Sequence, residues 1–305
     1  MGITRSGWGS RLARSNRRSS DESYLVGHRT AHQPEPLPVF SSDRDWFGSV
    51  VVRRWRGALH QLLVSGVDLS RLGPIFITHH HYDHINDLYP VILSTATLGR
   101  VDTLHIYGPG GTQQIVDALL NGVYAPDIRF RIEENREVLR RTQGGHQRRE
   151  AISDVAVHEI GSGVAAVGGG WRVMADYVRH GDFPDAPDFD WRCLGYRIEA
   201  QGEVITISGD TVPCPGVIGL ARDADLLVQC CMWSESALTN PTVQILTESV
   251  LPTTTQAGQI AAEAGVKRLV LTHLSASINE AGALANVRQH YQGKVLLGSD
   301  LLVIE

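Results

Sequence analysis

Four histidines and one aspartate occupy six consecutive positions, residues 79–84, directly after the apolar run at residues 75–77. A short apolar run of this kind is typical of a buried strand. Because side chains alternate along an extended chain, His79 and His81 should point to one side and His80 away from it. Neutral imidazole nitrogen and carboxylate oxygen are the ligands that zinc and similar ions take where thiolate is not used. The cluster therefore predicts a metal site at the end of a strand.

The second half of the cluster leads into a helix. Residues 85–98 have a helical pattern, so the chain turns just after Asp83 and His84. That turn carries these two side chains away from the direction taken by His79 and His81. We therefore expect Asp83 and His84 to serve a second ion, with Asp83 also able to orient or relay a proton as the catalytic residue.

The rest of the chain alternates between strand-like and helix-like patterns. Strands are predicted at residues 104–107, 155–158, 172–178, 195–200, 203–208, 225–228, 268–272 and 294–297, and helices at 112–120, 255–264 and 280–291. Residues 126–150 are polar and charged, so we expect them to run over the surface. Strands separated by helices in this way predict a layered α/β protein.

Composition limits the classes of function. The chain has 305 residues, of which 42% are hydrophobic, and no apolar run is long enough to cross a membrane. Residues 1–60 carry ten arginines against five acids, whereas residues 61–305 carry 18 basic and 28 acidic residues. A body with a net charge of −10 makes nucleic acid an unlikely partner, because phosphates must be neutralised by basic side chains.

The N-terminal segment is the least interpretable part. We divide the chain into a divergent segment, residues 1–57, and a single hydrolase-like domain, residues 58–305. Residues 1–20 are rich in arginine and serine and contain no acid, which is typical either of a transit peptide or of a first strand and glycine turn. Four cysteines without a CxxC pair predict buried thiols in a reducing compartment, so we expect a cytoplasmic protein. A homodimer is left open.

Residues 79–84 match the HxHxDH motif of the metallo-β-lactamase fold superfamily, and the resemblance extends over about residues 58–305. The superfamily's remaining ligands correspond to His180 after a mid-chain strand, Asp210 within Ser208-Gly209-Asp210-Thr211 and His273 at the end of a late strand. The resemblance implies a four-layer αββα sandwich. It also implies one ion on His79, His81 and His180, a second on Asp83, His84 and His273, and Asp210 bridging both. We expect Thr78, Ser208 and Thr272 to hold these ligands in place.

Within the superfamily the chain resembles the ribonuclease Z and arylsulfatase-like branch, through the sequences of residues 106–112, 195–198, 208–211 and 224–228. It departs from ribonuclease Z in three respects. The histidine thought to assist the leaving group corresponds to Leu251. Residues 229–231 read Gln-Cys-Cys, where the family often has a charged or His-Glu pair. No long arm rich in glycine and proline is present for gripping transfer RNA.

These features predict a hydrolase with two divalent ions, zinc or alternatively manganese, that cleaves an ester-type bond with a metal-bound hydroxide. The substrate is expected to be a small phosphodiester, sulfate ester, carboxylic ester or lactone, since the ligands alone do not decide among them. The alternatives are a ribonuclease Z-type tRNA 3′ endonuclease and a non-catalytic homologue, because residues 28–57 lack the family's expected strand.

Overall fold

The computed structural model of the protein describes residues 57–142, 152–181, 183, 185, 189–276 and 278–304. Apart from Gly57, the predicted N-terminal segment, residues 1–57, lies outside these ranges. Across the described part of the chain, no helix is both long and apolar enough to span a membrane.

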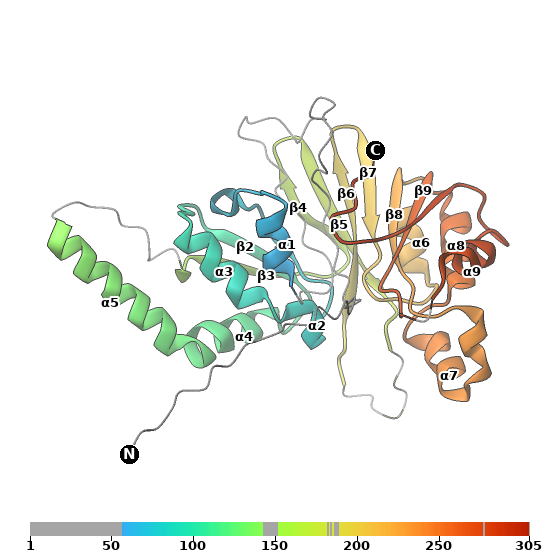
Figure 1. Cartoon of the computed structure of the whole chain (residues 1–305), viewed down its shortest axis with the longest axis horizontal. Coiled ribbons are helices and arrows are strands. Elements are labelled where there is room, and N and C mark those ends of the chain that lie inside the picture. The colour runs from blue at the N-terminus through green and yellow to red at the C-terminus, as the bar shows by residue number, and fades with distance from the viewer. Residues whose placement is uncertain are drawn as a thin grey trace, which may run out of the picture.

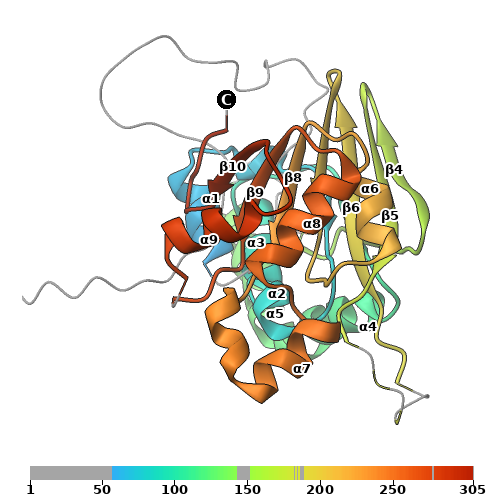
Figure 2. The ribbon, with the colours of Figure 1, turned by 90° about the vertical axis from the view of Figure 1, so that its right-hand side faces the viewer.

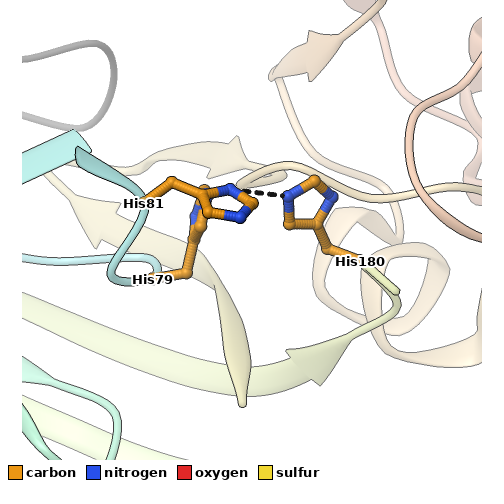
Figure 3. Close-up of side chains that lie close together, drawn as sticks. All are labelled: His79, His81 and His180. Carbon is orange, nitrogen blue, oxygen red and sulfur yellow. Dashed lines mark hydrogen bonds between the residues drawn. The ribbon is translucent and has the colours of Figure 1, made fainter. Parts of the chain in front are cut away.

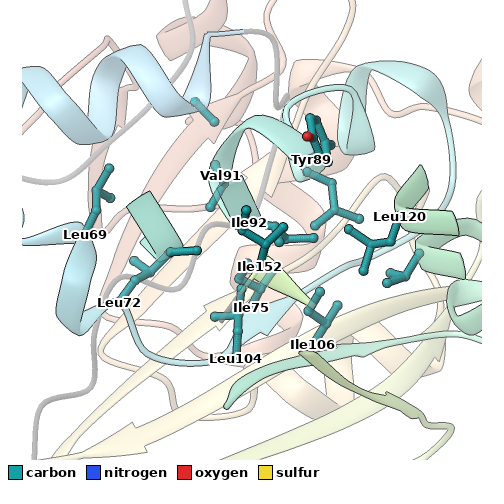
Figure 4. Close-up of a cluster of buried hydrophobic side chains, with 14 of the residues drawn as sticks. Leu69, Leu72, Ile75, Tyr89, Val91, Ile92, Leu104, Ile106, Leu120 and Ile152 are labelled. Carbon is teal, nitrogen blue, oxygen red and sulfur yellow. The ribbon is translucent and has the colours of Figure 1, made fainter. Parts of the chain in front are cut away.

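The smaller of two sheets carries the first metal-binding motif at its end. Strands β1 (Ile75–Phe76), β2 (Leu104–Gly108) and β3 (Val155–Glu159) are parallel, in the order β1-β2-β3. Helices α1 (Ala58–Val64) and α3 (Leu88–Thr97) lie against this sheet (Figure 1). Leucine and isoleucine side chains fill the space between sheet and helices, among them Ile75, Ile92 and Ile106 (Figure 4). This core fixes the end of β1, where the histidines begin.

The larger sheet supplies the other candidate ligands. In the described residues it has the order β10-β9-β8-β7-β6-β5-β4. Its strands are β4 (Gly163–Gly168), β5 (Trp171–Val178), β6 (Cys193–Ala200), β7 (Glu203–Ile207), β8 (Leu226–Cys230), β9 (Arg268–Thr272) and β10 (Lys294–Leu297). Strands β4 to β7 pair antiparallel, whereas β7 to β10 pair parallel. The parallel half follows from the helices that separate its strands.

Helices α6 (Pro215–Ala221), α8 (Thr254–Ala264) and α9 (Glu280–Val287) cover the outer face of the larger sheet (Figure 2). Helix α8 begins with a capping box, in which Thr253 and Gln256 exchange side-chain and backbone hydrogen bonds. Alanines and valines of these helices pack on the sheet in a second core. The loops leading into these helices begin where the strands end, beside the histidine cluster.

A third core lies between the two sheets. Phe76 of β1 meets Tyr196 of β6 with ring centroids 5.4 Å apart, and both side chains are fully buried. Val173 and Leu194 extend the same core. Three apolar cores separate four layers, in the order helices, sheet, sheet, helices, as the sequence predicts.

The polar segment expected to run over the surface is helical in its described part. After α4 (Thr112–Asp117) and the π-helical turn η2 (Ala118–Val123), helix α5 (Ala125–Thr142) extends away from the body (Figure 1). Stacking of Tyr89 on Tyr124, with centroids 3.6 Å apart, fixes its start. Farther along, arginines pair with Glu133 and Glu137 at three- and four-residue spacing.

Several short elements escaped prediction. They are β4, α6, the helix α7 (Pro241–Ser249), the four-residue helix α2 (Tyr82–Ile85) and the 3₁₀ turns η1 (Leu69–Arg71) and η4 (Glu235–Thr239). All four cysteines lie in the described part and are free, and all except Cys214 are buried. The expectation of buried thiols is therefore met by three of the four.

Candidate metal centre

The segment that leads into the histidines is held against the larger sheet by hydrogen bonds to its backbone carbonyl oxygens. The hydroxyl of Tyr196 donates to the carbonyl oxygen of Ile77 at 2.6 Å. The backbone N–H of Leu194 donates to the carbonyl oxygen of Thr78 at 2.9 Å. Both donors lie on β6, so the end of β1 crosses from the smaller sheet to the larger one. This crossing carries the segment toward the strand ends of the larger sheet.

The side chains of His79, His81 and His180 converge from opposite sides of this junction (Figure 3). Nε2 of His79 and Nε2 of His180 each lie 3.1 Å from Nδ1 of His81. His180 follows β5, so the group joins the two sheets. Neutral imidazole nitrogens are common metal ligands, so three of them turned toward one another form a candidate cation site.

The outer nitrogens of two of these rings have partners of their own. Thr78 Oγ1 lies 3.0 Å from Nδ1 of His79. Nδ1 of His180 donates to the carbonyl oxygen of Val250 at 2.7 Å. A carbonyl can only accept, so the proton of a neutral His180 ring is on Nδ1 and the lone pair of Nε2 points at the other histidines. Outer partners of this kind set the tautomer and orientation of metal-binding histidines.

Asp210 lies at the centre of the site and is buried. Its Oδ2 is 3.5 Å from Nε2 of His84 and 3.2 Å from Nε2 of His273. The preceding Gly209 has φ +62°, and a Cβ there would come within 2.6 Å of the carbonyl oxygen of Leu194. Only glycine accommodates both the left-handed backbone and the close approach. Gly209 thus allows the end of β7 to bring Asp210 in against β6.

The candidate ligands form three overlapping groups, and within each group the potential ligand atoms all lie within 4.8 Å of one another. The groups are His79 with His81 and His180, His79 with His84 and Asp210, and Asp83 with His84 and His273. The first and third match the two ligand sets implied by the resemblance. The middle group combines His79 of the first set and His84 of the third with Asp210, so the Asp210 carboxylate lies between the two sets.

The buried ring nitrogens show that this set suits divalent cations. Within the described residues, neither Nδ1 of His84 nor Nδ1 of His273 forms a hydrogen bond. Buried polar atoms normally have partners, because an unpaired one costs about 1–3 kcal/mol. His273 also has φ +60°, a left-handed backbone that is unusual for histidine. Imidazoles and carboxylates in this arrangement are the donors that zinc and manganese take.

Burial sets the protonation states of the site. It holds the pKa of His79 well below its ordinary value, and the nearby ring of His84 lowers it further. Burial also lowers the pKa of His180 and of His81. Burial alone would raise the pKa of Asp210, but His273 and His84 outweigh it and hold that pKa well below its usual range. Neutral imidazoles around an ionised carboxylate are the forms that bind a metal.

The seven predicted ligand residues all meet at this site, and His80 does not join them. Nε2 of His80 lies 2.9 Å from Thr112 Oγ1, so this ring faces the start of α4. Of the three residues expected to hold the ligands, Thr78 contacts His79. Ser208 and Thr272 instead donate to backbone carbonyl oxygens of Gly209 and Gln229.

Two further features of the site were not predicted. The carbonyl of Val250, which orients His180, has no signature in the sequence because any residue can supply it. Trp191 lies with its ring centroid 4.8 Å from that of His81 and 6.1 Å from that of His79. Leu251, at the leaving-group position implied by the resemblance, is buried and directly follows Val250.

A family model described as a beta-lactamase superfamily domain matches residues 46–274. Among curated proteins, the chain is 32% identical to a Ribonuclease Z of Mycolicibacterium paratuberculosis, over 81% of this chain and 84% of that protein. It is 26% identical to a Ribonuclease Z of Myxococcus xanthus, over 82% of this chain and 85% of that protein.

Two solved structures share the fold. The short form of human tRNase Z aligns with a TM-score of 0.55 at 20% identity, over 83% of this chain and 86% of that chain. The metallo-beta-lactamase fold protein YhfI from Bacillus subtilis also has a TM-score of 0.55, at 19% identity over 79% of this chain and 80% of that chain. The predicted αββα fold is confirmed by these matches and by the family model.

Proposed function

The chain belongs to the beta-lactamase superfamily and is a metal-dependent hydrolase, and from this premise we propose that it cleaves phosphodiester bonds. The observation that carries the proposal is the middle ligand group, in which Asp210 lies with His79 of one outer group and His84 of the other, in a chain whose relatives are named Ribonuclease Z. Two metal centres sharing one carboxylate suit in-line displacement at phosphorus. The proposal therefore selects phosphodiesters from the four classes of ester that the sequence analysis left open.

We propose that His79, His81 and His180 hold one divalent ion and that Asp83, His84 and His273 hold the other. When bound, such ions acidify a water molecule and withdraw charge from the scissile group. Asp210 fixes the separation of the two sets. Asp83 remains half-buried, with Oδ2 3.8 Å from Nε2 of His84, so its carboxylate is placed to accept a proton at the mouth of the site.

RNA is the substrate that the relatives' name suggests, and cleavage of a tRNA 3′ trailer is therefore the specific form to test. The comparisons favour this alternative more than the sequence analysis did, since the acidic body led us to expect no nucleic-acid partner. The apolar Leu251 still predicts slow departure of an alkoxide without acid assistance. Activated aryl phosphodiesters need no such help and should be cleaved faster.

The test is a substrate panel on zinc- or manganese-loaded protein, with Asp210→Ala as the matched inactive control. The panel contains a pre-tRNA with a 3′ trailer, bis(p-nitrophenyl) phosphate, p-nitrophenyl sulfate and a lactone. Turnover of either phosphodiester by the wild type and not by the variant supports the proposal. Turnover of the sulfate or lactone alone would refute it, and site-specific trailer cleavage would establish the ribonuclease form.

A further inference from the structure

A row of aromatic rings begins at the candidate metal centre and leads away from it. The ring of Trp191 lies 4.8 Å from that of His81, with an angle of 40° between the planes. Phe189 stacks on Trp191 at 5.8 Å and 12°, and Phe183 meets Phe189 edge-on at 5.7 Å and 65°. We call Trp191, Phe189 and Phe183 the aromatic row. Its inner end touches a ligand histidine, so whatever the row holds lies next to the reacting group.

The outer two rings are exposed although they are large and apolar. Phe189 is 55% exposed and Phe183 is 50% exposed, whereas Trp191 is partly buried against the second core. Leaving such rings in water forgoes most of the 1.5–3 kcal/mol (roughly) that burying an apolar side chain provides. Exposed aromatic surface beside a reactive centre is characteristic of a binding surface, since a ligand that covers it recovers that free energy.

The charges near the row are compatible with a phosphodiester. Asp190 lies between Phe189 and Trp191 in the chain, and its carboxylate pairs with the guanidinium of Arg192. Arg192 in turn lies 5.3 Å from the ring centroid of Tyr177. Pairing with Arg192 partly offsets the charge of the Asp190 carboxylate, which reduces its repulsion of an anionic substrate.

We propose that the aromatic row binds a flat aromatic group joined to the scissile phosphodiester, by stacking on Phe189 with Trp191 as its backing. A nucleobase and an aryl ring both fit this description, since both present a π-face of the same kind. The inference rests on the proposed phosphodiesterase function and specifies the substrate class of that same site. Stacking without hydrogen bonds to base edges would make the preference independent of base identity.

Three substrates with one leaving group separate this binding from the chemistry. They are methyl p-nitrophenyl phosphate, bis(p-nitrophenyl) phosphate and the p-nitrophenyl ester of thymidine 5′-monophosphate. All release p-nitrophenolate, so only the group that remains on phosphorus differs. We expect kcat/KM of the wild type to be at least about fivefold higher for the aryl and nucleoside esters than for the methyl ester. A preference for the aryl ester identifies an aryl ligand, and a preference for the nucleoside ester identifies a nucleobase.

The decisive variants are Phe189→Ala, Phe189→Tyr and, as the matched control, Phe130→Ala on α5, where the phenyl ring is also exposed. Phe189→Ala should lower kcat/KM for the aryl and nucleoside esters to about the value for the methyl ester, Phe189→Tyr should retain the preference, and Phe130→Ala should change nothing. Equal kcat/KM for all three esters in the wild type, or a preference that survives in Phe189→Ala, would overturn the inference.

Calorimetric binding of thymidine 5′-monophosphate tests the row independently of turnover. Metal-loaded wild type should bind it at least about fivefold more tightly than Phe189→Ala does. If the wild type hydrolyses no phosphodiester, the proposed function fails, and this measurement still decides the inference. Equal affinity of the two proteins would refute stacking on Phe189 even if hydrolysis were observed.

Discussion

His180 donates from Nδ1 to the carbonyl oxygen of Val250 at 2.7 Å, and this bond connects β5 to the segment that precedes α8. It determines which nitrogen of His180 faces the metal site. It also brings the backbone of residues 250–251 to the edge of the site. Leu251 directly follows Val250 and stands at the position where the resemblance places a histidine in ribonuclease Z.

Introducing a proton donor at position 251 should accelerate the cleavage of substrates that have poor leaving groups. We expect Leu251→His to raise kcat on methyl phosphodiesters or RNA by about tenfold or more, because general acid assistance stabilises a departing alkoxide. Hydrolysis of bis(p-nitrophenyl) phosphate should stay unchanged. Steady-state kinetics on both substrate types measure the difference, with Leu251→Met as the volume-conserving control. An equal rise on both types would argue against acid assistance.

Substitution of Asp210 and of His80 should have very different effects on turnover, although both residues lie close to the candidate ligands. We expect Asp210→Ala to reduce turnover by at least about a thousandfold, because both proposed ligand sets lose their shared carboxylate. His80→Ala should retain activity within about threefold, since its ring contacts Thr112 instead. Comparable losses in the two variants would show that our assignment of side-chain directions is wrong.

Metal addition should stabilise the folded protein. Zinc at about 100 times its dissociation constant contributes about 2.7 kcal/mol per site, enough to raise Tm by about 5 °C. Differential scanning calorimetry of chelator-treated protein, before and after zinc or manganese addition, measures the shift. Asp210→Ala should show a smaller shift. Elemental analysis should find two ions per chain, and fewer than one after loading would rule out the proposed centre.

Two glycines of α6 provide a matched pair for testing the packing behind the site. A Cβ on Gly216 would lie 1.9 Å from the carbonyl oxygen of Tyr177, whereas a Cβ on Gly219 would meet nothing within 4 Å. Gly216→Ala should lower the free energy of unfolding by about 1–3 kcal/mol through overpacking. Gly219→Ala should raise it by up to about 1 kcal/mol through helix propensity. Urea titrations of the two variants decide whether this contact limits the position of α6.

The sequence predicts the parts of the site whose signals are local. His79, His81, Asp83 and His84 are recognisable because they share one turn after an apolar run. Asp210 and His273 required the resemblance, since a single aspartate or histidine at a strand end is common. The carbonyl of Val250 was inaccessible to prediction, because a backbone group 70 residues from His180 carries no side-chain signature.

The same distinction applies to the fold. The apolar strands β5 to β10 were predicted with small errors at their ends. Strand β4 was missed because its short run of valine and alanine lies between glycines and stays partly exposed. Helix α5 was read only as a surface segment, since its helical form depends on pairs of arginine and glutamate and not on an apolar face.

The seven candidate ligands are distributed unevenly along the chain, and this distribution has a consequence for biosynthesis. Four of them emerge from the ribosome together, whereas His180, Asp210 and His273 follow on three separate strand ends. Synthesis proceeds from the N-terminus, so the early histidines are exposed long before their later partners exist. The centre cannot be completed until β9 has paired with β8 and brought His273 into place. Assembly of this candidate centre is therefore a late step in the synthesis and folding of the chain.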